Sequence, residues 1–405
     1  MRKKVWMIAV IALLTLAAAV SFSSSRKGAA QAQMNETDSV RMLAVNVGKA
    51  DSLLVFVEGK TYLIDTGTVQ SWGALKAALH AAGISKLDGV FLTHTDKDHM
   101  GGMEQLAQSD IQVDGWYGSA MYTDIKPDKH MLTKAAAIRN MQPVWLKAGD
   151  SVTVSDTSVF QVLGPITLDT AKENNNSLVM QLKTRHGSIL LAGDMELEEE
   201  SALIAAGSII RSDVLKVSHH GKDDATSPQF VQRVAPKVAV ISTNSVEEPD
   251  TPSVSVMTSL KRAGAKIAVT QNAKGGMMVT LVNGIASVEA VEWGNLPEID
   301  TSVQLGSLDT TQDVLTIRNT GRDAVSLDGW YVYSTRGDEI FFFPDNATLA
   351  SGATGRLGSS QTSDECDWRF HEKNVWHNKK KDVAVLYDAY GRVVSRLDNG
   401  LADDD

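Results

Sequence analysis

Short apolar runs alternate with helical patterns over residues 40–290. "RMLAVNVG", "SLLVFVEG" and "TYLIDTG" read as consecutive strands with Gly at or near their ends. "SWGALKAALHAAG" places apolar residues at helical spacing and ends at Gly, so it predicts a helix. Strands that alternate with helices in this way indicate an α/β domain.

Polar residues follow several of the predicted strands at the point where each strand ends. The strands in "LDGVFLTH", "GSILLAGD", "DVLKVSHHG" and "KVAVISTNS" are apolar, and their last residues are polar and potentially reactive. An open sheet builds a site when many strands deliver such side chains to one edge. The sequence therefore predicts a site along this edge.

A second pattern begins after "EAVEWGNLPEIDTS", residues 289–302, where the composition changes. "DVLTIRNTG", "SLDGWYVYS", "EIFFFP" and "DVAVLYDAYGRVV" follow at regular intervals separated by turns. Such spacing predicts an all-β sandwich of about 100 residues. We expect residues 293–302 to be a linker and residues 303–401 to form this sandwich.

The N-terminus carries the pattern of an export signal. "MRKKVWMIAVIALLTLAAAVSFSSS" combines a basic start with an uncharged apolar run, and an A-x-A cleavage motif ends at Ala32. That motif lies far from the apolar run, so an uncleaved anchor is the alternative. We expect residues 1–35 to be a signal peptide or an N-terminal anchor. The chain is then exported, and is either secreted or held on the outer face of the cytoplasmic membrane.

Composition and charge narrow the possible functions. The chain has 405 residues, 43% of them hydrophobic, and a formal net charge of -10. This acidic balance argues against broad electrostatic capture of nucleic acid, although a metal centre can supply positive charge locally. Cys366 is the only cysteine, so the chain has no internal disulfide and no cysteine-based metal site.

The densest group of candidate ligands is "HTDKDH", which contains His94, Asp96, Asp98 and His99. It directly follows an apolar strand. Buried ionised groups need partners or a metal, whereas a solvated loop would hold the same residues without any function.

Four further residues at strand ends favour the metal. They are Asp65 in "TYLIDTG", Asp194 in "ILLAGD", and His219 and His220 in "VLKVSHHG". Imidazole nitrogens and several carboxylates, one of which could bridge, are a set that two divalent cations would accept.

These motifs resemble a metallo-β-lactamase-fold hydrolase over residues 36–292. The main motif of that superfamily is His-x-His-x-Asp-His, and Asp96 replaces its second histidine here. With "NVGKADS", "NNNSLVMQL", "LAGDMELEEE" and "LKVSHHG", the pattern is similar to the extracytoplasmic hydrolase domain of ComEC competence proteins, which take part in DNA uptake. The resemblance implies a four-layer αββα fold.

The resemblance also implies roles for individual residues. His94 and Asp96 would bind a first metal, Asp98 and His99 a second, and Asp194 would bridge them. His219 or His220 would complete the second site, and the other histidine could act as a general acid. Six residues are expected to orient ligands or to contact substrate: Asp51, Asp65, Asn174, Asn176, Lys216 and Lys222.

The expected cofactors are two divalent ions, manganese or zinc, and the oxygen-rich first site favours the harder ion. A water made acidic between two cations would become the hydroxide that attacks a phosphodiester, with extracellular DNA as the expected substrate. Two alternatives stay open. One is a lactam, ester or thioester hydrolase on the same fold, and the other is a surface-binding protein with a vestigial hydrolase domain.

The C-terminal sandwich resembles the lamin-tail domain, an immunoglobulin-like all-β fold. The matching features are "NTG" at 319–321, Gly329-Trp330, "LASGAT" and the closing "VAVLYDAYGRVV". Trp330 is expected in the core. The resemblance implies attachment to membranes, cell surfaces, proteins or DNA. Lys379–Lys381 near Trp376 could hold a nucleic-acid backbone and a base, and a charged hairpin is the alternative.

Overall fold

The computed structural model describes residues 39–122, 130–292, 298–337, 339–344 and 346–402. The predicted N-terminal signal lies outside these ranges. Within them, no helix combines the length and apolar character needed to cross a membrane.

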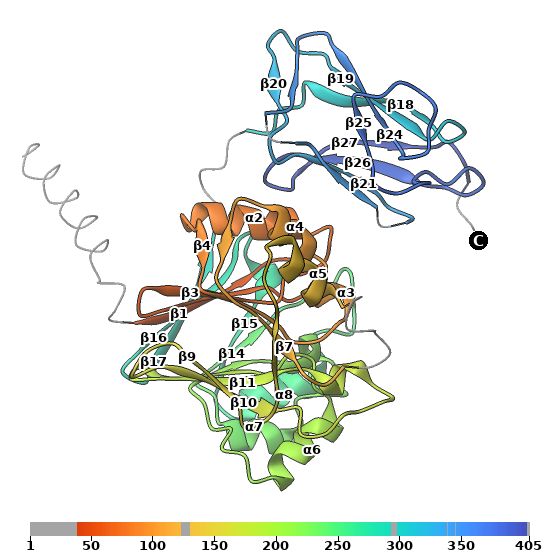
Figure 1. Cartoon of the computed structure of the whole chain (residues 1–405). Helices are drawn as coiled ribbons and strands as arrows, with labels where there is room; N and C mark the ends of the chain where they lie inside the picture. The colour runs from red at the N-terminus through yellow and green to blue at the C-terminus, as the bar shows by residue number, and fades with distance from the viewer. Residues whose placement is uncertain (1–38, 123–129, 293–297, 338, 345, 403–405) are drawn as a thin grey trace, which may run out of the picture.

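Two large sheets form the first domain (Figure 1). The first sheet has the order β17-β16-β1-β2-β3-β5-β7-β8, and the second has the order β15-β14-β13-β12-β11-β10-β9. The strands of the first sheet are β1 (Val40–Val45), β2 (Leu53–Val57), β3 (Lys60–Ile64), β5 (Gly89–Leu92), β7 (Trp116–Ser119), β8 (Val144–Leu146), β16 (Gly276–Val282) and β17 (Ile285–Val291). Those of the second are β9 (Ser151–Thr153), β10 (Val159–Gly164), β11 (Val179–Thr184), β12 (Gly187–Leu191), β13 (Val214–Lys216), β14 (Val238–Ile241) and β15 (Lys266–Val269).

Helices cover the outer faces of both sheets. The first sheet is covered by α2 (Trp72–Ala81), α4 (Met103–Gln108) and α5 (Met131–Ile138), and the second by α6 (Leu197–Ala205), α7 (Pro228–Val234) and α8 (Val254–Arg262). Apolar side chains from both sheets, including Phe91, Phe160 and Met180, form the central core. The four-layer αββα fold is confirmed. It arises because each sheet is apolar on both faces and needs a partner on each.

The C-terminal sandwich packs two four-stranded sheets around a core that contains Trp330, as expected. One sheet joins β18 (Val303–Asp309), β19 (Val314–Asn319), β24 (Thr354–Gly358) and β25 (Trp368–Arg369). The other joins β22 (Ile340–Phe342), β21 (Tyr331–Ser334), β26 (Val383–Tyr387) and β27 (Val393–Asp398). A small pair joins β20 (Val325–Ser326) and β23 (Thr348–Leu349).

Trp376 also lies in this core, where its ring meets Phe370 edge-on at 5.8 Å. A buried ring has no free face for a nucleobase. The suggested aromatic partner for the basic stretch Lys379–Lys381 is therefore wrong. The stretch is a charged loop and not a hairpin, because it connects β25 and β26, which belong to different sheets.

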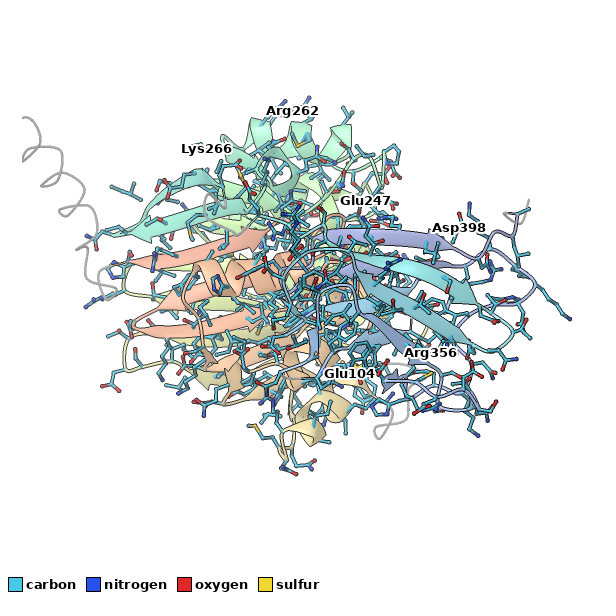
Figure 2. All side chains as sticks on the ribbon, turned by 90° about the horizontal axis from the view of Figure 1, so that it is seen from above. Glu104, Glu247, Arg262, Lys266, Arg356 and Asp398 are labelled. Carbon is cyan, nitrogen blue, oxygen red and sulfur yellow. The ribbon has the colours of Figure 1, made fainter. Side chains whose placement is uncertain are left out.

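The two domains share a packed seam above α2 (Figure 1). Tyr331 and Tyr387 of the sandwich stack at 4.7 Å and belong to the same apolar cluster as Trp72. Gly73 and Gly391 meet backbone to backbone, so that an added Cβ on Gly391 would lie 1.8 Å from the Cα of Gly73. Figure 2 shows from above how side chains fill the body of the molecule, with Arg262 and Lys266 at its edge.

Glu199 on α6 is a buried carboxyl group that makes the stability of the fold depend on pH. Its Oε1 atom accepts the Ile166 backbone N–H at 2.8 Å, but burial raises the pKa of Glu199 to about 7. A raised carboxyl pKa means that the folded state holds this proton more tightly. Stability is therefore lost as pH rises from the ordinary value of 4.5 through about 7.

We expect Glu199→Gln to remove this loss, because an amide oxygen can still accept from Ile166. Urea unfolding of the chelator-treated protein should show the variant more stable than the wild type by about 2 kcal/mol at pH 8, with no such gain at pH 4. An equal difference at both pH values would contradict the assignment.

Candidate metal centre

The candidate ligands lie where strands from both sheets end. Asp65 follows β3, and His94 comes two residues after β5. Asp98 and His99 lie in the short helix α3 (Lys97–Met100) that begins after the same strand. Asp194 follows β12. The fold therefore gathers residues that are far apart in sequence at one edge of the sandwich.

Asp194 is the centre of this group. Its Oδ2 atom lies 3.2 Å from His99 Nε2 and 3.2 Å from His220 Nε2. His220 Nε2 also lies 3.4 Å from Asp98 Oδ2. His94, His99 and Asp194 form one set of potential ligands, and Asp98, His99 and His220 form another. We call these five residues the central cluster.

The donor atoms of the central cluster fit a metal. His94 Nε2, His99 Nε2, His220 Nε2 and Asp194 Oδ1 are buried and have no hydrogen-bond partner in the part of the chain that the structure describes. A buried polar atom without a partner is costly, and four that converge need a common one. A divalent cation that prefers nitrogen and oxygen ligands satisfies this need.

Hydrogen bonds to the other ring nitrogens orient the histidines. His99 Nδ1 lies 2.8 Å from Asp65 Oδ2, and Asp65 also accepts from the backbone and hydroxyl of Thr93, at 2.8 and 2.7 Å. His220 Nδ1 lies 2.8 Å from the Ser242 carbonyl oxygen. A donor at Nδ1 leaves the Nε2 lone pair facing the cluster, as metal-binding histidines require. Asp65 thus occupies the orienting position that the resemblance implies.

Three non-glycine residues at this edge have left-handed backbones. The φ angle is 58° at Asp65, 45° at His219 and 54° at His220. Such conformations cost free energy and persist where the surroundings fix them, often at functional sites. Here they turn Asp65 and His220 towards the cluster.

The charges of the cluster balance one another. Burial opposes ionisation of Asp98 and Asp194, yet the positive charges of His99 and His220, and of Lys49 beside Asp98, outweigh burial and lower both carboxyl pKa values. Burial likewise opposes the charge on His220, but Asp194 and Asp98 raise its pKa to about 9. A cation that binds these nitrogens must displace their protons.

His219 faces away from the central cluster. Its Nδ1 atom lies 2.8 Å from Asp224 Oδ1, and its Nε2 atom lies 3.3 Å from Asn174 Nδ2. Glu196 completes this flanking group. The sequence left open which histidine binds metal and named His219 among the ligands. The geometry instead favours His220, because the left-handed turn points the two rings in different directions.

Asp96 and the two asparagines lie at different distances from the cluster. Asp96 is half exposed, and its Oδ2 atom lies 3.7 Å from His94 Nε2. Asn174 contacts His219 and Glu196, so it lies beside the cluster. The amide of Asn176 is engaged by the Asp169 backbone and Glu173, so it stabilises its own loop and is not placed to contact substrate.

Lys216 and Lys222 also differ from expectation. Lys216 is buried, with Nζ 2.7 Å from Asp51 Oδ2 and 2.9 Å from the Val217 carbonyl oxygen. Lys222 pairs with Glu248 at 3.0 Å. Neither lysine is placed as a free phosphate contact. Asp51 instead forms the buried ion pair that packs behind His220.

Sequence reasoning missed two contributions. Ser177 and Thr93 place their hydroxyls 3.3 and 3.1 Å from His94 Nδ1. Lys49 places Nζ 2.7 Å from Asp98 Oδ2. Lys49 lies in the motif "NVGKADS", which was a signal, but its loop conformation alone brings it to Asp98.

This fold and edge site define a domain of the metallo-β-lactamase fold with a candidate metal centre. Residues 45–245 match the family model described as Metallo-beta-lactamase superfamily, and residues 298–400 match that of the Lamin Tail Domain. The chain therefore carries a metallo-β-lactamase superfamily domain followed by a lamin tail domain.

Relatives of the hydrolase domain include competence proteins of the ComEC type. ComE operon protein 3 of Bacillus subtilis (strain 168) is 31% identical over 244 residues, covering 56% of this chain and 31% of that protein. Competence protein ComA of Neisseria gonorrhoeae is 27% identical over 260 residues, covering 64% of this chain and 34% of that protein. The matched region thus spans about a third of these relatives.

A solved structure is also similar to this chain, at low sequence identity. It is Igni18, described as a novel metallo hydrolase from the archaeon Ignicoccus hospitalis, with 15% identity and a TM-score of 0.41. It covers 60% of this chain and 98% of that chain.

Proposed function

We propose that this chain is an exported phosphodiesterase that uses two divalent metal ions to hydrolyse DNA outside the cytoplasm. The observation that carries the proposal is the convergence of four unpartnered buried donor atoms on one spot. Such a group is unfavourable without a cation and well suited to one.

Divalent cations at such a site make a bound water more acidic and neutralise charge on a phosphoryl group. The protein supplies the geometry. His94 and Asp96 would hold one ion, and Asp98, His99 and His220 the other, with Asp194 shared between them. Asp65 and the Ser242 carbonyl fix two of the rings before any ion arrives.

His219 is left for proton transfer. Asp224 accepts from Nδ1, which fixes the ring, and Asn174 and Glu196 surround its other edge. In this proposal His219, as the histidine of the pair outside the central cluster, takes up a proton at Nε2 in place of the hydrogen bond from Asn174 Nδ2 and gives this proton to the leaving oxygen.

DNA is the proposed substrate because the relatives are named for competence, and one further relative, from Haemophilus influenzae, is named Recombination protein 2. Export rests on the pattern of residues 1–35. The half-exposed Asp96 supports manganese at the first site, because a carboxylate is a harder ligand than imidazole.

Chelation should abolish activity. We expect the purified protein to cleave DNA and bis-p-nitrophenyl phosphate, to lose at least about a hundredfold in rate after a chelator, and to recover with manganese. RNA, nitrocefin and a thioester serve as comparison substrates. Faster turnover of the lactam or the thioester than of either phosphodiester would replace the proposal with the other hydrolase class.

A further inference from the structure

Lys49 is a lysine whose side chain directly contacts a carboxylate of the central cluster. Its Nζ atom lies 2.7 Å from Asp98 Oδ2, the oxygen that also faces His220 Nε2 at 3.4 Å. The side chain of Lys49 is 19% exposed, whereas that of Lys216 is only 1% exposed. The ammonium group therefore lies at the entrance of the cluster, between the ligands and solvent.

The backbone around Lys49 is held in place. Glu247, labelled in Figure 2, accepts the Lys49 N–H at 2.9 Å, and Asn46 donates to the Ala273 carbonyl oxygen at 3.0 Å. Gly48 has a φ of 79°, and an added Cβ there would lie 2.8 Å from the Glu247 carboxylate. This turn fixes the Cα of Lys49 beside the site, while the flexible stem of the side chain lets the ammonium move.

In the metal-free protein the Lys49 ammonium neutralises the same oxygen that a divalent cation would bind. The ammonium and the cation compete for Asp98, because two positive groups at one carboxylate oxygen repel each other. A bound cation would release the ammonium at the mouth of the site, within reach of an incoming substrate.

The charge of Lys49 indicates what that substrate is. A released ammonium would carry a positive charge at the mouth of the site, where the Lys49 side chain is partly exposed. A phosphodiester carries a single negative charge and is attracted to this ammonium, whereas a neutral ester or lactam is not.

We propose that Lys49 is a specificity-determining residue that neutralises Asp98 in the metal-free protein and contacts the anionic phosphoryl group of the substrate in the metal-loaded protein. This inference rests on the proposed phosphodiesterase function. It goes further, because it assigns the preference for an anionic substrate to one side chain and predicts opposite effects on metal and substrate binding.

The test compares Lys49→Gln and Lys49→Arg with a matched control, Lys237→Gln. Lys237 pairs with Asp213 at the same distance of 2.7 Å, but it precedes β14 at the opposite edge of the sheet. Manganese affinity of each metal-free protein is measured by competition with a chromophoric chelator. KM is measured for anionic bis-p-nitrophenyl phosphate and for neutral p-nitrophenyl acetate.

We expect Lys49→Gln to bind manganese about three- to tenfold more tightly and to raise KM for the phosphodiester about tenfold, with KM for the acetate unchanged. Lys49→Arg should keep KM for the phosphodiester within about threefold of wild type, because the charge is retained. Lys237→Gln should change none of these values more than about twofold.

Weaker manganese binding by Lys49→Gln, or an unchanged phosphodiester KM, would overturn the inference. Loss of a purely structural lysine would weaken both metal binding and substrate binding, or neither of them. A wild-type protein that binds manganese but cleaves no phosphodiester would overturn the proposed function instead. In that case tighter metal binding by Lys49→Gln would still support competition for Asp98.

Discussion

Replacement of Asp194 by Asn should remove metal binding and hydrolysis together. Asp194 Oδ2 lies 3.2 Å from the Nε2 atoms of both His99 and His220, and its Oδ1 atom has no hydrogen-bond partner among the described residues. The amide keeps the shape of the carboxylate but loses the charge. We expect metal content below one ion per chain and a rate about a thousandfold lower, measured by elemental analysis and by phosphodiester cleavage.

The matched control for this variant is Asp213→Asn. Asp213 is also a carboxylate next to a strand of the second sheet, but it directly precedes β13 at the opposite edge, where it pairs with Lys237 and accepts the Ser188 backbone N–H. The Asp213→Asn variant should retain two ions and near-normal turnover. If Asp194→Asn kept both ions, or if the two variants behaved alike, the central cluster would not be the metal site.

The sequence predicted the layers and the site edge because both depend on local patterns. Apolar strands such as "LDGVFLTH" can be recognised from the sequence alone. The polar residues at their ends mark the edge of the sheet to which parallel strands bring their side chains. Asp65, His94, Asp98, His99 and Asp194 meet there for that reason. The ordered motifs then favoured the αββα fold over other α/β folds.

The sequence could not predict which of the two histidines, His219 or His220, enters the central cluster. Both residues adopt left-handed backbones, and this conformation decides which ring enters the cluster. Two adjacent histidines give no sequence signal for it. Asn176 was misplaced for a related reason, because its loop uses the side-chain amide to satisfy the Asp169 backbone.

The seam between the domains was also hidden from sequence reasoning. Trp72 on α2 and the tyrosines of β21 and β26 each fit the core pattern of their own domain. In the folded chain they form one apolar cluster, closed by the contact of Gly73 with Gly391. A glycine chosen for close approach across domains resembles an ordinary turn glycine when only the sequence is read.

A series of contacts connects the seam between the domains to the candidate metal centre. The segment before α2 binds the ligand helix α3, because Thr66 N–H donates to the His99 carbonyl oxygen at 2.7 Å and Gly101 N–H donates to the Gly67 carbonyl oxygen at 2.8 Å. Asp65, which orients His99, begins the same segment. The lamin tail domain packs on its far end, through Trp72 and a hydrogen bond from Gln70 to Tyr333.

We therefore expect Gly391→Ala to destabilise the whole chain and to weaken metal binding. The added methyl group would lie 1.8 Å from the Gly73 Cα, which forces the seam apart. The free energy of unfolding should fall by about 2 to 3 kcal/mol more than in the control below, because only Gly391→Ala adds a collision to the backbone strain. Chemical denaturation and chelator competition measure the two effects.

Excess manganese should restore part of the lost stability, because mass action favours the folded state that binds it.

Gly352→Ala separates the seam from the cost of the backbone conformation. Gly352 lies in the same domain with a φ of 71°, close to the 68° of Gly391, but an added Cβ there meets nothing within 4 Å. Both variants carry the strain of a left-handed alanine, about 1 kcal/mol, and only Gly391→Ala adds the collision with α2. If the two variants lost equal stability and kept equal manganese affinity, the tail would be an independent attachment. A larger loss at Gly391 in both measurements would make the lamin tail domain a structural part of the hydrolase, since a contact outside the catalytic domain would then help to hold Asp65 and His99 in register.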